Sequence, residues 1–156
     1  MRLDLIAVGR LKAGPEADLV RGYAARATAA GRALALGPVD ITEIDERKAR
    51  DRAQQSDRLA EAVPAGAAMI LLDERGKTLS SEAFSALLAA ERDAGRPGLA
   101  FLIGGADGHS PDLRQRADRM LSFGPMVWPH VLARVMLAEQ LYRAISILGG
   151  SPYHRA

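Results

Sequence analysis

Short apolar segments alternate with longer segments of helical periodicity along the whole chain. Four apolar runs, at residues 3–8, 39–44, 67–72 and 99–103, have the length and composition of buried strands. Helical patterns follow them at residues 15–30, at 45–62, from Ser80 or Ser81 up to Gly95, from Pro111, and at 130–148. This alternation predicts an α/β fold in which a parallel sheet carries helices on both faces.

Two segments that follow predicted strands are unusual in composition. Residues 73–77 (DERGK) form a predicted charged turn after the strand that ends at Leu72, and residues 104–108 (GGADG) follow the strand at 99–103. Glycines allow close approach of the backbone to a ligand, and the carboxyl edge of a parallel sheet is the usual binding crevice. The glycine segment matches neither GxGxxG nor a P-loop, so a tight structural turn explains it equally well.

Residues 121–130 (LSFGPMVWPH) predict a shaped loop rather than a regular element. Each proline fixes its own φ and restricts the preceding residue, so Pro125 and Pro129 exclude a strand or helix between them. Pro129 and His130 then begin the last predicted helix, where free backbone donors can face a ligand. Arg134 falls within the apolar sector of that helix. Such a charge needs a partner, either a carboxylate such as Glu139 of another subunit or a phosphate or substrate group.

Composition limits the classes of protein to which the chain can belong. The 156 residues, 48% hydrophobic and 26% charged, predict one globular domain spanning residues 1–156. The sequence has neither an apolar run long enough to span a membrane nor a signal peptide, so we expect a cytoplasmic protein with no membrane partner. The lack of cysteine excludes disulfides and thiolate chemistry, and the three histidines lack metal-ligand spacing, so no metal is expected.

The charge of the chain permits nucleic acid as a partner without requiring it. The formal net charge is +2. Arg10 and Lys12 follow the first predicted strand, and further arginines and lysines are interleaved with acidic residues in the segment 45–62. Mixed charge of this density is typical of a solvated helix face. For the arginines of this segment, an RNA-facing role is the alternative. Arg10 and Lys12 lie at the end of a predicted strand, where α/β proteins usually place ligand sites, and solvated loop charge is the other explanation for them.

Motifs spread over nearly the whole chain carry a family resemblance. They are AVGRLK at residues 7–12, LD and GK at 72–73 and 76–77, FLIGGADG at 101–108, WPH at 128–130, LARV at 132–135, AEQLYRA at 138–144 and PYHR at 152–155. Together they resemble the pseudouridine N3-methyltransferases of the SPOUT superfamily, which modify large-subunit ribosomal RNA. The resemblance implies a C-terminal trefoil knot, a homodimer, and S-adenosylmethionine as methyl donor. It also implies a pseudouridine in helix 69 of 23S ribosomal RNA, within the 70S ribosome, as substrate.

The resemblance assigns roles to individual residues. The cofactor is expected to contact Leu72, Gly105, Gly124, Pro125, Met126, Val127, Trp128 and Pro129. The RNA is expected to contact Arg134, Tyr153, His154 and Arg155. His130 is the candidate general base for the N3 proton, with helix capping or support of the loop as its alternative role. Many relatives carry a serine and a less constrained residue in the segment 123–125, so the contact expected from Gly124 is a backbone contact.

Two other functional classes compete with this interpretation. A nonenzymatic ribosome-binding factor could use the same fold without catalysis. A small phosphoryl-transfer enzyme is the third possibility, but the chain lacks a P-loop lysine and clustered magnesium ligands.

Overall fold

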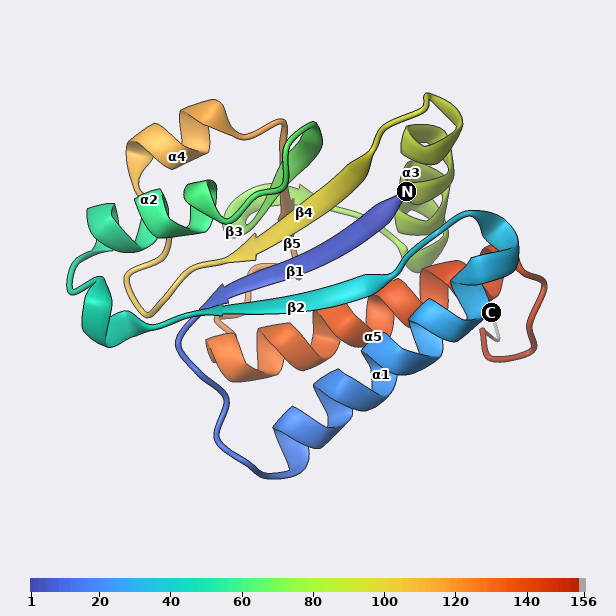
Figure 1. Ribbon diagram of the computed structural model, residues 1–156, viewed down its shortest axis with the longest axis horizontal. Helices are drawn as coiled ribbons and strands as arrows, with labels where there is room; N and C mark the ends of the chain where they lie inside the picture. The colour runs from blue at the N-terminus through green and yellow to red at the C-terminus, as the bar shows by residue number, and fades with distance from the viewer. Residues whose placement is uncertain (155–156) are drawn as a thin grey trace.

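A five-stranded parallel sheet in the order β2-β1-β4-β3-β5 forms the middle layer of the molecule (Figure 1). The structure is a computed structural model that describes residues 1–154. Its elements are β1 (Arg2–Val8), α1 (Pro15–Gly31), the 3₁₀ turn η1 (Arg32–Leu34), β2 (Val39–Ile44), the 3₁₀ turn η2 (Glu46–Lys48), α2 (Arg52–Glu61), β3 (Ala67–Thr78), α3 (Ser81–Asp93), β4 (Gly98–Ile103), α4 (Pro111–Arg116), β5 (Arg119–Ser122) and α5 (His130–Leu148). The predicted α/β fold with a parallel sheet is confirmed.

Helices cover both faces of the sheet, as predicted, and each face has its own apolar core. On one face, α1, α3 and α5 pack against alternate side chains of the strands, with Leu5 and Phe101 among those fully buried. On the other face, Leu59 of α2 and Leu113 of α4 pack against Ile6 and its neighbours. All six residues of β4 are buried, as expected for a central strand covered on both faces.

The predicted helix at residues 45–62 is divided into η2 and α2. The side chain of Asp45 accepts a hydrogen bond from the backbone N–H of Arg47, and that of Asp51 accepts one from the N–H of Gln54. Ala49, between the two elements, has an extended backbone. Two aspartate caps six residues apart therefore begin two elements where helical periodicity alone predicts one.

The predicted charged turn at residues 73–77 is wrong, because β3 continues through it to Thr78. Leu72 and Lys77 both pair with Leu121, so the intervening residues bulge away from β5. A Cβ atom at Gly76 would lie 2.4 Å from the backbone carbonyl carbon of Leu121, which explains the glycine there. The sequence interpretation missed β5, whose four residues are too short for a clear pattern, and the shaped loop begins at Phe123 rather than Leu121.

The last helix, α5, lies between α1 and α3 under the sheet (Figure 1). This position between two helices buries the polar side chain of Ser146. No helix among residues 1–154 is long and apolar enough to cross a membrane. The trefoil knot stays a prediction.

Candidate active site

Three segments at the carboxyl edge of the sheet line a cleft of about 280 Å³. They are the start of the β3 bulge, the glycine loop (residues 104–108) and the proline loop (residues 123–129), and the first turn of α5 contributes His130 and Ala133. Six of the eight expected cofactor residues line this cleft: Leu72, Gly105, Gly124, Met126, Val127 and Trp128. Pro125 and Pro129 lie in the same loop but outside the lining.

The glycine loop presents backbone to the cleft because side chains do not fit there. The N–H of Gly108 donates to the carbonyl of Gly105 at 3.0 Å, which closes the turn. A Cβ at Gly104 would lie 2.9 Å from the carbonyl carbon of Gly108, and one at Gly105 would lie 2.6 Å from Oε1 of Gln55. The loop is therefore both a tight structural turn and a wall of the cleft.

The proline loop combines a constrained start with exposed apolar side chains. Gly124 has a φ of +104°, and its N–H and carbonyl both bond the hydroxyl of Ser122 at 3.1 Å. Met126 and Val127 are 69% and 89% exposed. Within residues 1–154, the N–H groups of Met126, Val127 and Trp128 donate to no protein acceptor. The loop thus offers free backbone donors and apolar surface to a ligand.

A buried polar group under the cleft escaped the sequence interpretation. His109 is 1% exposed, and its Nε2 lies 3.1 Å from the carbonyl oxygen of Leu72. A carbonyl only accepts, so we assign the proton of the neutral ring to Nε2. Burial lowers the pKa of His109. The histidine therefore holds β3 at Leu72, where its regular pairing with β5 ends. The position of His109 directly before Ser110, the N-cap of α4, was the sequence signal that could have predicted its structural role.

Asp73 of β3 and Arg114 of α4 form a second contact beside the cleft, next to the contact between His109 and Leu72. Nε of Arg114 donates to Oδ2 of Asp73 at 2.7 Å, and the N–H of Arg75 donates to the other oxygen of that carboxylate. Burial opposes ionisation of Asp73, but these hydrogen bonds outweigh it and lower its pKa. The first residues of the β3 bulge are thereby held against α4.

His130 lines the cleft from the first position of α5. It is the first residue of α5, whose N-cap is Pro129, and no side chain caps this helix. Among the described residues, the ring of His130 makes no hydrogen bond. The capping role left open by the sequence is therefore not the role seen in the structure.

Arg134 lies inside the subunit rather than on its surface. It is 2% exposed, its Nη1 lies 3.3 Å from Oε1 of Glu43, and its Nη2 donates to the carbonyl of Val8. Burial lowers the pKa of Arg134, although Glu43 and Glu46 oppose this effect. The carboxylate partner expected as one alternative is present, but it is Glu43 of the same subunit and not Glu139.

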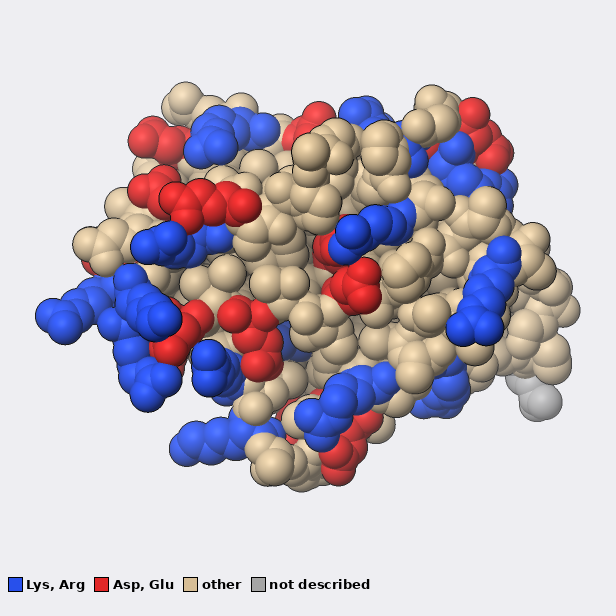
Figure 2. Space-filling view, viewed as in Figure 1, with Lys and Arg blue, Asp and Glu red and all other residues tan. Residues whose placement is uncertain are grey.

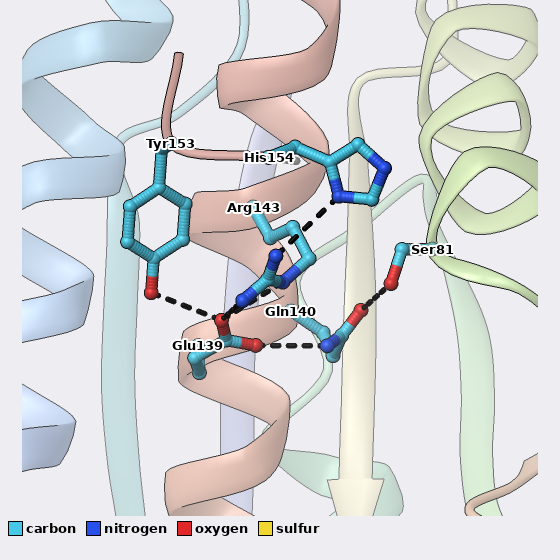
Figure 3. A network of polar contacts seen from close by, with 6 residues as sticks. All are labelled: Ser81, Glu139, Gln140, Arg143, Tyr153 and His154. Carbon is cyan, nitrogen blue, oxygen red and sulfur yellow. Dashed lines mark hydrogen bonds and ion pairs between the residues drawn. The ribbon is translucent and has the colours of Figure 1, made fainter. Parts of the chain in front are cut away.

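The C-terminal tail docks on α5 through a polar network (Figure 3). Tyr153 donates its hydroxyl proton to Glu139 at 3.0 Å, and Arg143 donates to the same carboxylate oxygen. Nε2 of His154 lies 2.8 Å from Glu82 of α3. Neither Tyr153 nor His154 lines the cleft of its own subunit. Arg155 lies outside the described residues.

Known proteins resemble this chain over its whole length. A family model described as "Predicted SPOUT methyltransferase" matches residues 1–154. Proteins of Dinoroseobacter shibae, Cereibacter sphaeroides and Ruegeria pomeroyi, each named "Ribosomal RNA large subunit methyltransferase H", are 58%, 58% and 54% identical to it, with 99% of this chain and 99% of each relative covered. With a cleft of backbone loops at the carboxyl edge of a parallel sheet, this chain belongs to the SPOUT methyltransferase family.

Proposed function

We propose that this protein transfers the methyl group of S-adenosylmethionine to N3 of a pseudouridine in helix 69 of 23S ribosomal RNA, in the assembled 70S ribosome of the cytoplasm. The observation that carries the proposal is the cleft made of three backbone loops, in a chain whose relatives are named ribosomal RNA large subunit methyltransferases. The particular nucleotide follows from the motif resemblance.

The residues of the cleft fit the cofactor. Leu72, Val127 and the other apolar side chains suit a flat adenine ring, and the free N–H groups of the proline loop suit its ring nitrogens. The glycine loop leaves room for close backbone approach. When bound, S-adenosylmethionine supplies an electrophilic methyl group on a sulfonium. Positioning by these loops can contribute roughly 7 to 11 kcal/mol to lowering the barrier.

The reaction also requires removal of a proton. As N3 forms its bond to the methyl carbon and the carbon–sulfur bond breaks, the N3 proton must leave the base. We assign its acceptance to His130, which lines the cleft and whose ring forms no hydrogen bond with a described residue. A positioned general base contributes typically 10²- to 10⁴-fold in rate.

The RNA contacts are assigned to the C-terminal tail and not to Arg134 of α5. We retain Tyr153, His154 and Arg155 as RNA contacts. For Arg134 the burial and the Glu43 pair favour a positioning role, in which it holds the start of α5 against β1 and β2.

We further propose that the protein is a homodimer. An apolar groove of about 470 Å³ adjoins the cleft and shares residues 121–124 with it. Its lining includes Leu19 of α1, Phe84 of α3 and Val135 of α5, and Leu19 is 45% exposed. A second copy seated on this groove would bury these side chains. Sedimentation equilibrium of wild type and Leu19→Glu checks this, and a monomeric wild type would contradict it.

The direct test uses purified protein, methyl-labelled S-adenosylmethionine and 70S ribosomes from a strain that lacks this activity. We expect label on the helix 69 pseudouridine, located by nuclease digestion and mass spectrometry. Cofactor binding by calorimetry without label would direct the search to another RNA. Ribosome binding without cofactor binding would support the nonenzymatic alternative instead.

A further inference from the structure

Six basic side chains lie in the segments that follow β1 and β2, the second of which runs from η2 to the first residue of α2. They are Arg10 and Lys12 after β1, and Arg47, Lys48, Arg50 and Arg52 after β2, and all six residues are exposed. We call these six residues the basic edge. Figure 2 shows Lys and Arg side chains gathered over the end of the molecule where β1 and β2 end.

Most of these side chains form no ion pair with a described residue. Arg47 pairs with Asp45 at 2.9 Å. Arg10, Lys12, Lys48 and Arg50 form no ion pair with any residue in the range 1–154.

Acidic side chains are fewer in these loops. Only Asp45, Glu46 and Asp51 accompany the six basic residues, which leaves an excess of three positive charges. The whole chain has a formal net charge of +2, so the remainder is slightly negative. The basic edge is therefore a local concentration of charge rather than a sample of a uniformly basic surface.

The basic edge and the cleft share one edge of the sheet. All five strands are parallel, so their carboxyl ends lie together, with β2 and β1 on one side and β4, β3 and β5 on the other. The cleft lies on the β4-β3-β5 side and the basic edge lies beside it. A polyanion bound in the cleft could therefore extend across the basic edge.

Hydrogen bonds hold the two regions in a fixed relation. Glu43 of β2 accepts both from Arg134 of α5 and from the N–H of Leu11, in the loop that carries Arg10 and Lys12. On the other face, the N–H of Ser110 donates to the hydroxyl of Ser56 in α2 at 2.9 Å. These bonds connect the first basic loop, and the helix α2 that continues from the second basic segment, to elements that flank the cleft.

We propose that the basic edge binds the phosphodiester backbone of the RNA strand flanking the nucleotide held in the cleft. The proposal rests on the proposed function for the identity of the RNA. Guanidinium and ammonium groups suit phosphate oxygens. The described basic loops carry no aromatic side chain on which a base could stack, so phosphates rather than bases are the expected partner.

The test is a salt titration of ribosome binding. The triple variant Arg10→Gln/Lys48→Gln/Arg50→Gln removes three charges that have no ion-pair partner in the described structure. Affinity for purified 70S ribosomes is measured between about 50 and about 200 mM salt without cofactor. We expect the slope of log affinity against log salt to fall by about two, so that added salt weakens wild type roughly fifteenfold more than the variant. Turnover at saturating ribosomes and cofactor affinity should stay unchanged.

A control variant removes charge at the opposite edge. Arg32→Gln/Arg116→Gln changes two exposed arginines near the amino ends of the strands, and neither forms an ion pair with a residue in the range 1–154. We expect this control to keep the wild-type slope, and both variants to keep the wild-type melting temperature within a few degrees.

Three outcomes would overturn the proposal. One is an unchanged slope of log affinity against log salt in the basic-edge variant. Another is an equally large fall of this slope in the control variant. The third is loss of binding to vesicles containing phosphatidylserine with ribosome binding intact, which would assign the surface to a membrane. Because binding is measured without methyl transfer, failure of the proposed function appears separately, as wild-type binding without label.

Discussion

The guanidinium of Arg134 lies 3.3 Å from the carboxylate of Glu43, a residue 91 positions away in the sequence. Arg134 is on the second turn of α5 and Glu43 is near the end of β2. This partly buried pair, with the bond from Arg134 to the carbonyl of Val8, joins the last helix to the first two strands beside the cleft.

Arg134→Ala should destabilise the protein by about 3 to 5 kcal/mol, since it removes the cation paired with Glu43 and the donor to the Val8 carbonyl. Glu43→Gln should cost less, because the Glu43 side chain is 29% exposed and its amide can still accept. Urea denaturation measures both variants, with Arg32→Ala as an exposed control that changes stability by less than about 0.5 kcal/mol. Equal stability of Arg134→Ala and Arg32→Ala would contradict the structural role.

His130→Ala should lower turnover by about 10²- to 10⁴-fold and leave cofactor affinity nearly unchanged. His130 lines the cleft, and its ring forms no hydrogen bond with another part of the described structure. Single-turnover methylation of ribosomes and calorimetry with S-adenosylmethionine separate the two effects. Wild-type turnover in the variant would eliminate His130 as the base.

His109 should make stability depend on pH in the weakly acidic range. Its pKa is lowered by burial in the folded state, so the unfolded chain binds the proton more readily. The neutral, buried His109 makes its full contribution to the free energy of unfolding above pH about 6.5, the pKa of histidine in the unfolded chain. That contribution is lost as the pH falls from there towards the lower pKa of the folded state, by up to about 1.4 kcal/mol per pH unit.

Denaturation between about pH 5 and 7.5 tests this expectation. The slope of the free energy of unfolding against pH should shrink in His109→Gln relative to wild type. An unaltered slope in His109→Gln would refute the assignment.

Gly76→Ala should destabilise the β3 bulge by about 1 to 3 kcal/mol, because its Cβ would overlap the backbone of Leu121. Gly22→Ala is the matched control. Gly22 lies within α1, and a Cβ there meets nothing within 4 Å, so alanine should stabilise the helix by about 0.5 to 1 kcal/mol. Thermal unfolding compares the two variants, which should shift in opposite directions.

Tyr153→Phe should raise the KM for ribosomes several-fold with kcat retained, because the tail loses the hydrogen bond that orients it on Glu139. The stability cost should be about 1 kcal/mol. Tyr142→Phe is the control, since Tyr142 packs its ring against Tyr153 but its hydroxyl bonds no described residue. A wild-type KM in Tyr153→Phe would show that the docked tail is not required for binding.

Local physical chemistry was sufficient to predict most of the elements from the sequence. The apolar runs predict β1, β2 and β4 within one residue, and the serine and proline signals correctly start α3 and α4, because caps and buried strands depend on neighbouring residues. The same reasoning failed where long-range pairing decides the backbone. Residues 73–77 are extended only because β5 lies beside them, and β5 is too short to specify itself.

The sequence by itself determined the fold class, the unusual loops and, through its motifs, the family. Tertiary structure alone decided which groups meet. It brought Glu43 to Arg134, placed His109 beneath Leu72, and put the basic loops on the same edge as the cleft. These relations depend on strand order, because parallel strands that are neighbours in the sheet need not be neighbours in the chain. No local pattern of residues encodes that order.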